Sequence, residues 1–82
     1  MRVFLSRKAA KALRETSSDV RRRLEEKISE LSRTPYPAGC RKLRGAPNAY
    51  RLRVGDYRIL YATLTKDEIL VFKIARRETA YL

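Results

Sequence analysis

Three arginines crowd around one expected turn, at positions 51, 53 and 58. Arg51 and Arg53 alternate with apolar residues, so an extended strand would carry both on one side. Gly55-Asp56 supplies the turn, because glycine tolerates positive φ and aspartate can hydrogen-bond its own backbone. A guanidinium grips two phosphate oxygens and keeps its charge at any working pH. Such a cluster is therefore suited to binding phosphate. The rival interpretation, which the residues alone favour for Arg51 and Arg53, is the solvated face of an edge strand.

The sequence contains no histidine. This excludes serine and cysteine nucleophiles that depend on histidine, histidine acid–base pairs and most zinc sites. No carboxylates are spaced as metal ligands, and no glycine-rich phosphate loop is present. We therefore expect neither a metal nor a cofactor. A catalytic site in this chain must work with arginine, lysine, tyrosine and a few carboxylates.

The chain is strongly basic, with 20 Lys and Arg against 9 Asp and Glu and a formal net charge of +11. Such an excess attracts polyanions, so nucleic acid or an acidic protein is the expected partner. No apolar run approaches the roughly 20 residues that span a bilayer, and we expect no membrane partner and no signal peptide. The single cysteine, Cys40, excludes an internal disulfide and fits a cytoplasmic location.

Periodicity and turn residues predict the elements that position the arginines. The length of 82 residues predicts one domain, 1–82. A first helix is expected at 7–15, capped by Ser6. A second helix is expected to begin at a cap at Ser18 and to stop near 33–34, because Pro35 and Pro37 cannot continue it. Strands are expected at 2–5, 40–44, 50–54, 57–64 and 68–75. The last of these is apolar on both faces, as in a central strand.

This order, β-α-α-β-β-β-β, predicts an α+β fold of two layers, with an N-terminal helical hairpin packed on an antiparallel sheet of four to five strands. The second helix has a buried stripe at Val20, Leu24, Ile28 and Leu31. That stripe is expected to cover the apolar side of the sheet, and the opposite side would show the arginines. Tyr50, Tyr57 and Tyr61 are expected in or beside the core rather than as stacking platforms.

Three segments together resemble the RelE/ParE superfamily of toxins from bacterial and archaeal toxin–antitoxin modules. They are KLRG at 42–45, YRLRVGDYRILY at 50–61 and RRETAY at 76–81. The RelE branch is the more similar, and its members cut messenger RNA in the ribosomal A site. The resemblance implies an endoribonuclease toxin that inhibits translation, with the ribosome, messenger RNA and an acidic RelB-like antitoxin as partners. The toxin alone is expected to be a monomer.

The resemblance also implies an active site. The catalytic residues carried over by position are Arg51, Arg53, Arg58, Arg77 and Tyr81. Arg58 and Arg77 would hold the scissile phosphate, Arg51 and Arg53 would orient the RNA, and Tyr81 would help activate the 2′-hydroxyl. Further RNA contacts are expected from Lys42, Arg44, Arg41 and Arg76, and Arg76 is also the alternative to Arg77.

Two departures keep other functions open. The positions of Arg51 and Arg53 are often lysine in the RelE branch, and arginine cannot serve as a general base. The ParE branch, which targets DNA gyrase, shares much of the hairpin pattern and generally lacks the catalytic set. The alternatives are therefore a gyrase inhibitor without nuclease activity and a basic binding module whose catalytic set has decayed. Tyr81 has a packing role as its own alternative.

Overall fold

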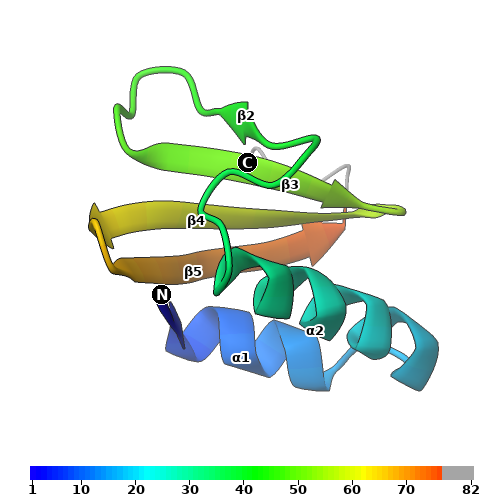
Figure 1. The fold of residues 1–82 in the computed structure, drawn as a ribbon. Helices are drawn as coiled ribbons and strands as arrows, with labels where there is room; N and C mark the ends of the chain where they lie inside the picture. The colour runs from blue at the N-terminus through cyan, green and yellow to red at the C-terminus, as the bar shows by residue number, and fades with distance from the viewer. Residues whose placement is uncertain (77–82) are drawn as a thin grey trace.

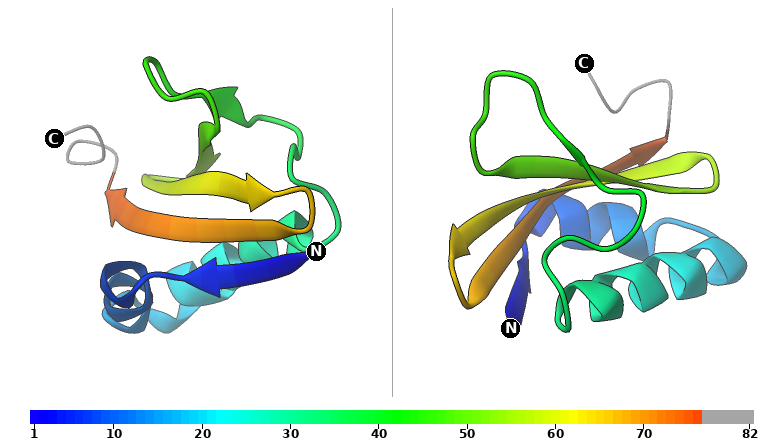
Figure 2. Two further views of the ribbon diagram at one scale, coloured as in Figure 1. Left: turned by 90° about the vertical axis from the view of Figure 1, so that its left-hand side faces the viewer. Right: turned by 45° about the horizontal axis from the view of Figure 1, so that its top comes forward.

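The computed structural model describes residues 1–76. Within them, two helices lie on one face of a five-stranded sheet, and no helix covers the other face (Figures 1 and 2). The elements are β1 (Arg2–Leu5), α1 (Arg7–Arg14), α2 (Ser18–Leu31), β2 (Arg41–Lys42), β3 (Ala49–Val54), β4 (Tyr57–Thr65) and β5 (Glu68–Arg76). The predicted α+β fold of two layers is confirmed. Over the same residues, neither helix has the length and apolarity needed to cross a bilayer.

The strand order is β1-β5-β4-β3-β2. The pairs β2–β3, β3–β4 and β4–β5 are antiparallel as predicted, whereas β1 runs parallel to β5, so the sheet is mixed. The Ser6 N–H donates to the Val71 oxygen at 2.9 Å, which ends β1 beside β5 and starts α1 at the same place. β5 thus lies between two neighbours, as its apolar composition predicted.

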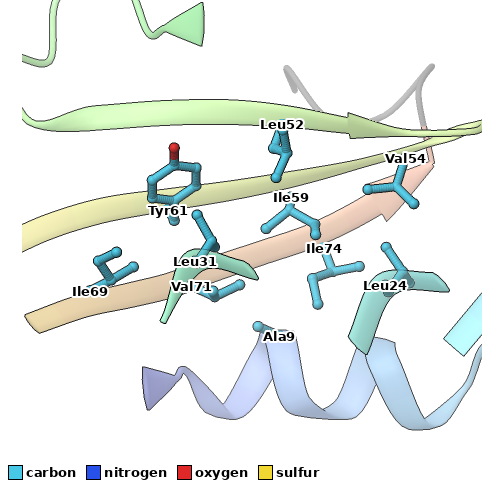
Figure 3. Packing of buried hydrophobic residues seen from close by; sticks show 10 residues of the cluster. All are labelled: Ala9, Leu24, Leu31, Leu52, Val54, Ile59, Tyr61, Ile69, Val71 and Ile74. Atoms are coloured by element: carbon cyan, nitrogen blue, oxygen red, sulfur yellow. The ribbon is translucent and has the colours of Figure 1, made fainter. Parts of the chain in front are cut away.

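Both helices bury their apolar stripes against the sheet (Figure 3). The core cluster consists of Ala9, Leu24, Leu31, Leu52, Val54, Ile59, Tyr61, Ile69, Val71 and Ile74. Of the predicted stripe, Leu24 and Leu31 are fully buried, and Val20 and Ile28 pack against the cluster. Because these side chains come from α1, α2 and three strands, the core fixes which face of the sheet stays open.

Several element ends differ from the predictions. Ser17, not Ser18, caps α2: its backbone is extended and its hydroxyl accepts from the Val20 N–H. α2 stops at Leu31, because the N–H groups of the next residues turn back to the Ser29 and Glu30 oxygens. α1 ends at Arg14. β2 covers only Arg41–Lys42, because the chain that follows it turns away from the neighbouring strand β3. Gly45 takes φ +77 in that turn.

A β-bulge interrupts β5 near its middle. Tyr61 pairs with Val71 and Leu60 pairs with Lys73, so Phe72 is an extra residue on β5. The alternation of the strand is reversed there: Val71 and Ile74 both face the helices although they are three residues apart. Lys73 consequently faces away from the core. Periodicity in the sequence could not reveal this, because the bulge exists only in the pairing with β4.

Candidate nucleic-acid interface

The uncovered face of the sheet gathers positive charge from four strands. Residues that pair directly across strands point to the same face. On this face lie Arg41, Arg51, Arg53, Arg58 and Lys73, which we call the cationic face. Four of them were predicted as site residues, from β2, β3 and β4. The structure brings these four together.

The cationic face is arranged in two rows across the strands. One row runs Arg41, Arg51, Leu60 and Lys73 from β2 to β5. Neighbouring strands lie about 4.8 Å apart, so this row spans roughly 14 Å. Leu60 is 5% exposed and lies outside the core cluster, so it is a nearly buried apolar residue between charged neighbours.

The second row runs Arg53, Arg58 and Ala75. Arg58 is half-buried, and its Nη1 atom is shielded from solvent, which strengthens the field of its charge toward a bound anion. Arg53 is exposed, and its Nε donates to the Gly55 oxygen at 3.2 Å. That bond draws the guanidinium of Arg53 toward the turn, where it also lines a hollow of about 610 Å³ beside α2.

The remaining predicted residues lie elsewhere. Lys42 pairs with Tyr50, so it faces the opposite side of the sheet from Arg41. Arg44 follows β2 in the loop, where Lys42, Arg44 and their neighbours line a hollow of about 570 Å³. Arg76 pairs with Tyr57, and strand alternation places it on the helix side. Arg77 and Tyr81 fall outside the described residues.

Lys73 lies on the cationic face, although no sequence pattern predicted it there. It is the one lysine within β5, and its spacing from Ile69 and Val71 would put it in the core if the strand were regular. Its presence in an otherwise apolar run was the available signal. The bulge at Phe72 decides where it points.

Three tyrosines pack against one another in a series that begins in the core at Tyr61 and ends at the exposed Tyr36. Tyr50 stacks on Tyr61 with ring centroids 5.6 Å apart, and Tyr36 meets Tyr50 edge-on at 5.2 Å. Tyr61 is fully buried, its hydroxyl donates to the Pro35 oxygen at 2.7 Å, and burial raises its pKa. A side-chain hydrogen bond with Tyr50 raises the pKa of Tyr36. Tyr61 is therefore a packing residue, as predicted, and not a proton acceptor.

Acidic and metal-binding groups contribute little to this picture. No group of three or more His, Cys, Asp or Glu side chains capable of holding a metal occurs in residues 1–76. The ion pairs of α2, Arg22 with Asp19 and Lys27 with Glu30, lie on the helix layer. The chemistry available on the cationic face is thus anion binding by guanidinium and ammonium groups.

Residues 3–81 match the family model for the ParE toxin of type II toxin–antitoxin systems, parDE. The chain belongs to this family.

Relatives and solved structures agree with this assignment. A protein of Methanocaldococcus jannaschii that carries the toxin name RelE1 is 31% identical, over 96% of this chain and 92% of its own length. The mRNA interferase toxin RelE of Escherichia coli is 34% identical, over 87% and 77%. The archaeal RelE–RelB complex from Pyrococcus horikoshii contains a chain with a TM-score of 0.79 and 30% identity, over 96% and 97%.

Proposed function

We propose that the protein, as a single toxin domain of residues 1–82, is an endoribonuclease that cuts messenger RNA in the ribosomal A site. The cationic face is the observation that carries this proposal, because it gathers several positive side chains on one open surface. Such a surface fits the sugar–phosphate backbone of an RNA strand. The mRNA interferase name of the E. coli relative supports the same activity.

The proposed reaction needs no metal or cofactor. The 2′-oxygen of the ribose attacks the adjacent phosphorus, and the bond to the 5′-oxygen breaks. One product ends in a 2′,3′-cyclic phosphate and the other in a 5′-hydroxyl. Arg58 and Arg77 stabilise the charge that develops on the phosphate oxygens, an effect typically worth about 10²–10³ in rate for each donor. Arg51 and Arg53 hold the strand for in-line attack.

The protons move through other groups in this proposal. Arginine is never deprotonated at working pH, so neither Arg51 nor Arg53 accepts the proton of the 2′-hydroxyl. Tyr81 is assigned that role in this proposal. The leaving 5′-oxygen takes a proton from solvent or from the ribosome.

The partner we propose is an acidic, RelB-like antitoxin in the cytoplasm. The net charge of +11 favours an acidic protein. The P. horikoshii relative was solved in complex with RelB. Without the antitoxin, the toxin acts as a monomer that enters the ribosome.

A second candidate function is inhibition of DNA gyrase without RNA cleavage. The family model that matches the chain is described by ParE, and this observation favours it. Residues of the cationic face would then bind the gyrase complex instead of messenger RNA. A binding module with a decayed catalytic set would share the same surface.

In-vitro translation and a gyrase supercoiling assay, both with the purified protein, distinguish these functions. We expect messenger RNA cut within A-site codons and normal gyrase supercoiling. Arg58→Ala is expected to lower the cleavage rate at least about a hundredfold. Arg22→Ala, which removes an exposed arginine from α2, is the control and should cleave at the wild-type rate. Intact messenger RNA together with blocked supercoiling would instead establish the gyrase function.

A further inference from the structure

Lys73 owes its place on the cationic face to the bulge in β5. The bulge inserts Phe72 between the pairs Tyr61–Val71 and Leu60–Lys73. Bulges are frequent next to active sites, where they redirect a side chain. In this strand the redirected side chain is the lysine, and Ile74 takes the core position.

The start of α1 holds the bulge in position. The Ser6 hydroxyl donates to the Phe72 oxygen at 3.2 Å and accepts from the Ala9 N–H at 3.1 Å. The Ser6 N–H donates to the Val71 oxygen at 2.9 Å. One serine therefore joins the first turn of α1 to the two residues that precede Lys73, so the direction of Lys73 is built into the fold.

Lys73 continues the row that Arg41 and Arg51 begin. Leu60 separates Arg51 from Lys73, and these two outer positions are roughly 10 Å apart across two strand spacings. Leu60 is 5% exposed, so the row has a positive side chain on each side of a nearly buried apolar residue. An extended backbone that crosses the strands would meet a cation on β3 and another on β5, with a sugar or base above Leu60.

We propose that Lys73 binds the RNA backbone beside the scissile phosphate and so sets the position of the messenger on the cationic face; this rests on the proposed function. A lysine ammonium is a compact charge that binds phosphate without the two-point geometry of arginine. Lys73 therefore contributes to binding of the strand, and Arg58 contributes to the chemical step.

The test uses ribosomes programmed with a messenger of defined A-site codon, and measures single-turnover cleavage over a range of toxin concentrations. Lys73→Met and Lys73→Gln are expected to raise the half-saturating concentration about fivefold and to leave the saturating rate within about twofold. The reason is that an interaction made equally in the ground state and the transition state affects affinity only. Lys73→Arg is expected to restore the wild-type value. Lys8→Met, on the exposed side of α1, removes the same charge and serves as the control.

Salt dependence gives a second readout. The slope of log half-saturating concentration against log salt is expected to fall by about 0.7 in Lys73→Met, the value for one phosphate contact on a single strand. A purely structural role would leave that slope unchanged. Using both Lys73→Met and Lys73→Gln, each checked by thermal unfolding, covers the case in which one of them does not fold.

The outcomes separate the two claims. A wild-type protein that leaves the messenger intact overturns the proposed function and this inference with it. An active wild type with Lys73 variants equal to Lys8→Met overturns the inference alone. A loss confined to the saturating rate also overturns it, because it would place Lys73 in the chemical step.

Discussion

Arg53 of β3 lies directly opposite Arg58 of β4 in the antiparallel pair. Like charges at directly opposed positions destabilise a sheet, by roughly 0.2–1 kcal/mol relative to a neutral pair. The bond from Arg53 Nε to the Gly55 oxygen turns one guanidinium toward the turn, which lessens the repulsion. The pair therefore concentrates positive charge on the open face of the sheet at a cost in stability.

The first prediction concerns this pair. Arg53→Thr is expected to raise the free energy of unfolding by about 0.5 kcal/mol in low salt, because it removes the repulsion and adds a residue suited to strands. Urea denaturation measures the change. In about 1 M salt, where charges are screened within about 3 Å, the gain should shrink. Arg2→Thr is the control, since Arg2 of β1 lies beside Glu68 of β5 rather than beside a cation. Equal gains in both variants would contradict the explanation.

The second prediction concerns the serine that joins α1 to β5. Ser6→Ala removes the cap on the Ala9 N–H and the bond to the Phe72 oxygen, so we expect a loss of about 1–2 kcal/mol in the free energy of unfolding. Ser17→Ala removes only the exposed cap of α2, whose bond to the Val20 N–H is 3.4 Å long. Its loss should be smaller, about 0.5 kcal/mol. Urea midpoints that fall equally would argue against a special role for Ser6.

The third prediction concerns pH. Burial raises the pKa of folded Tyr61 above the ordinary value of 10.0. Above pH 10 the unfolded chain releases this proton while the folded protein keeps it. The stabilisation is therefore complete below about pH 10, and is lost at about 1.4 kcal/mol per pH unit as the pH rises toward the folded-state pKa.

Tyr61→Phe isolates this contribution. At about pH 8 the variant should be about 1 kcal/mol less stable than the wild type, because it lacks the bond to the Pro35 oxygen. Between about pH 10 and 11 the difference should narrow or reverse. Urea denaturation of both proteins across this range provides the measurement. A stability difference that stays constant across the whole range would contradict the assigned role.

The fourth prediction compares two leucines of the sheet. Leu52 is 1% exposed and belongs to the core cluster, whereas Leu64 is 51% exposed. Leu52→Ala should cost about 2–5 kcal/mol in the free energy of unfolding, because it leaves a cavity under α2. Leu64→Ala should change it by less than about 0.5 kcal/mol. Thermal and urea unfolding check both values, and similar losses would mean that the core is placed wrongly.

The sequence by itself determined the local elements and the hairpin arginines. The spacing of Leu24 and Leu31 predicted the buried side of α2. Gly55-Asp56 predicted the turn that places Arg58 opposite Arg53. These features depend on side-chain period and turn chemistry within a few residues, which are written directly in the chain. The roles of Arg77 and Tyr81 stay predictions.

The tertiary structure alone decided the pairing of distant segments. It placed β1 parallel to β5, put Arg41 on the cationic face and its neighbour Lys42 on the other, and moved Lys73 out of the core through the bulge at Phe72. Each of these depends on register between strands, and a shift of one residue transfers a side chain to the opposite face. Register is set by the packing of the whole core and by contacts such as that of Ser6, which no local pattern in the sequence reports.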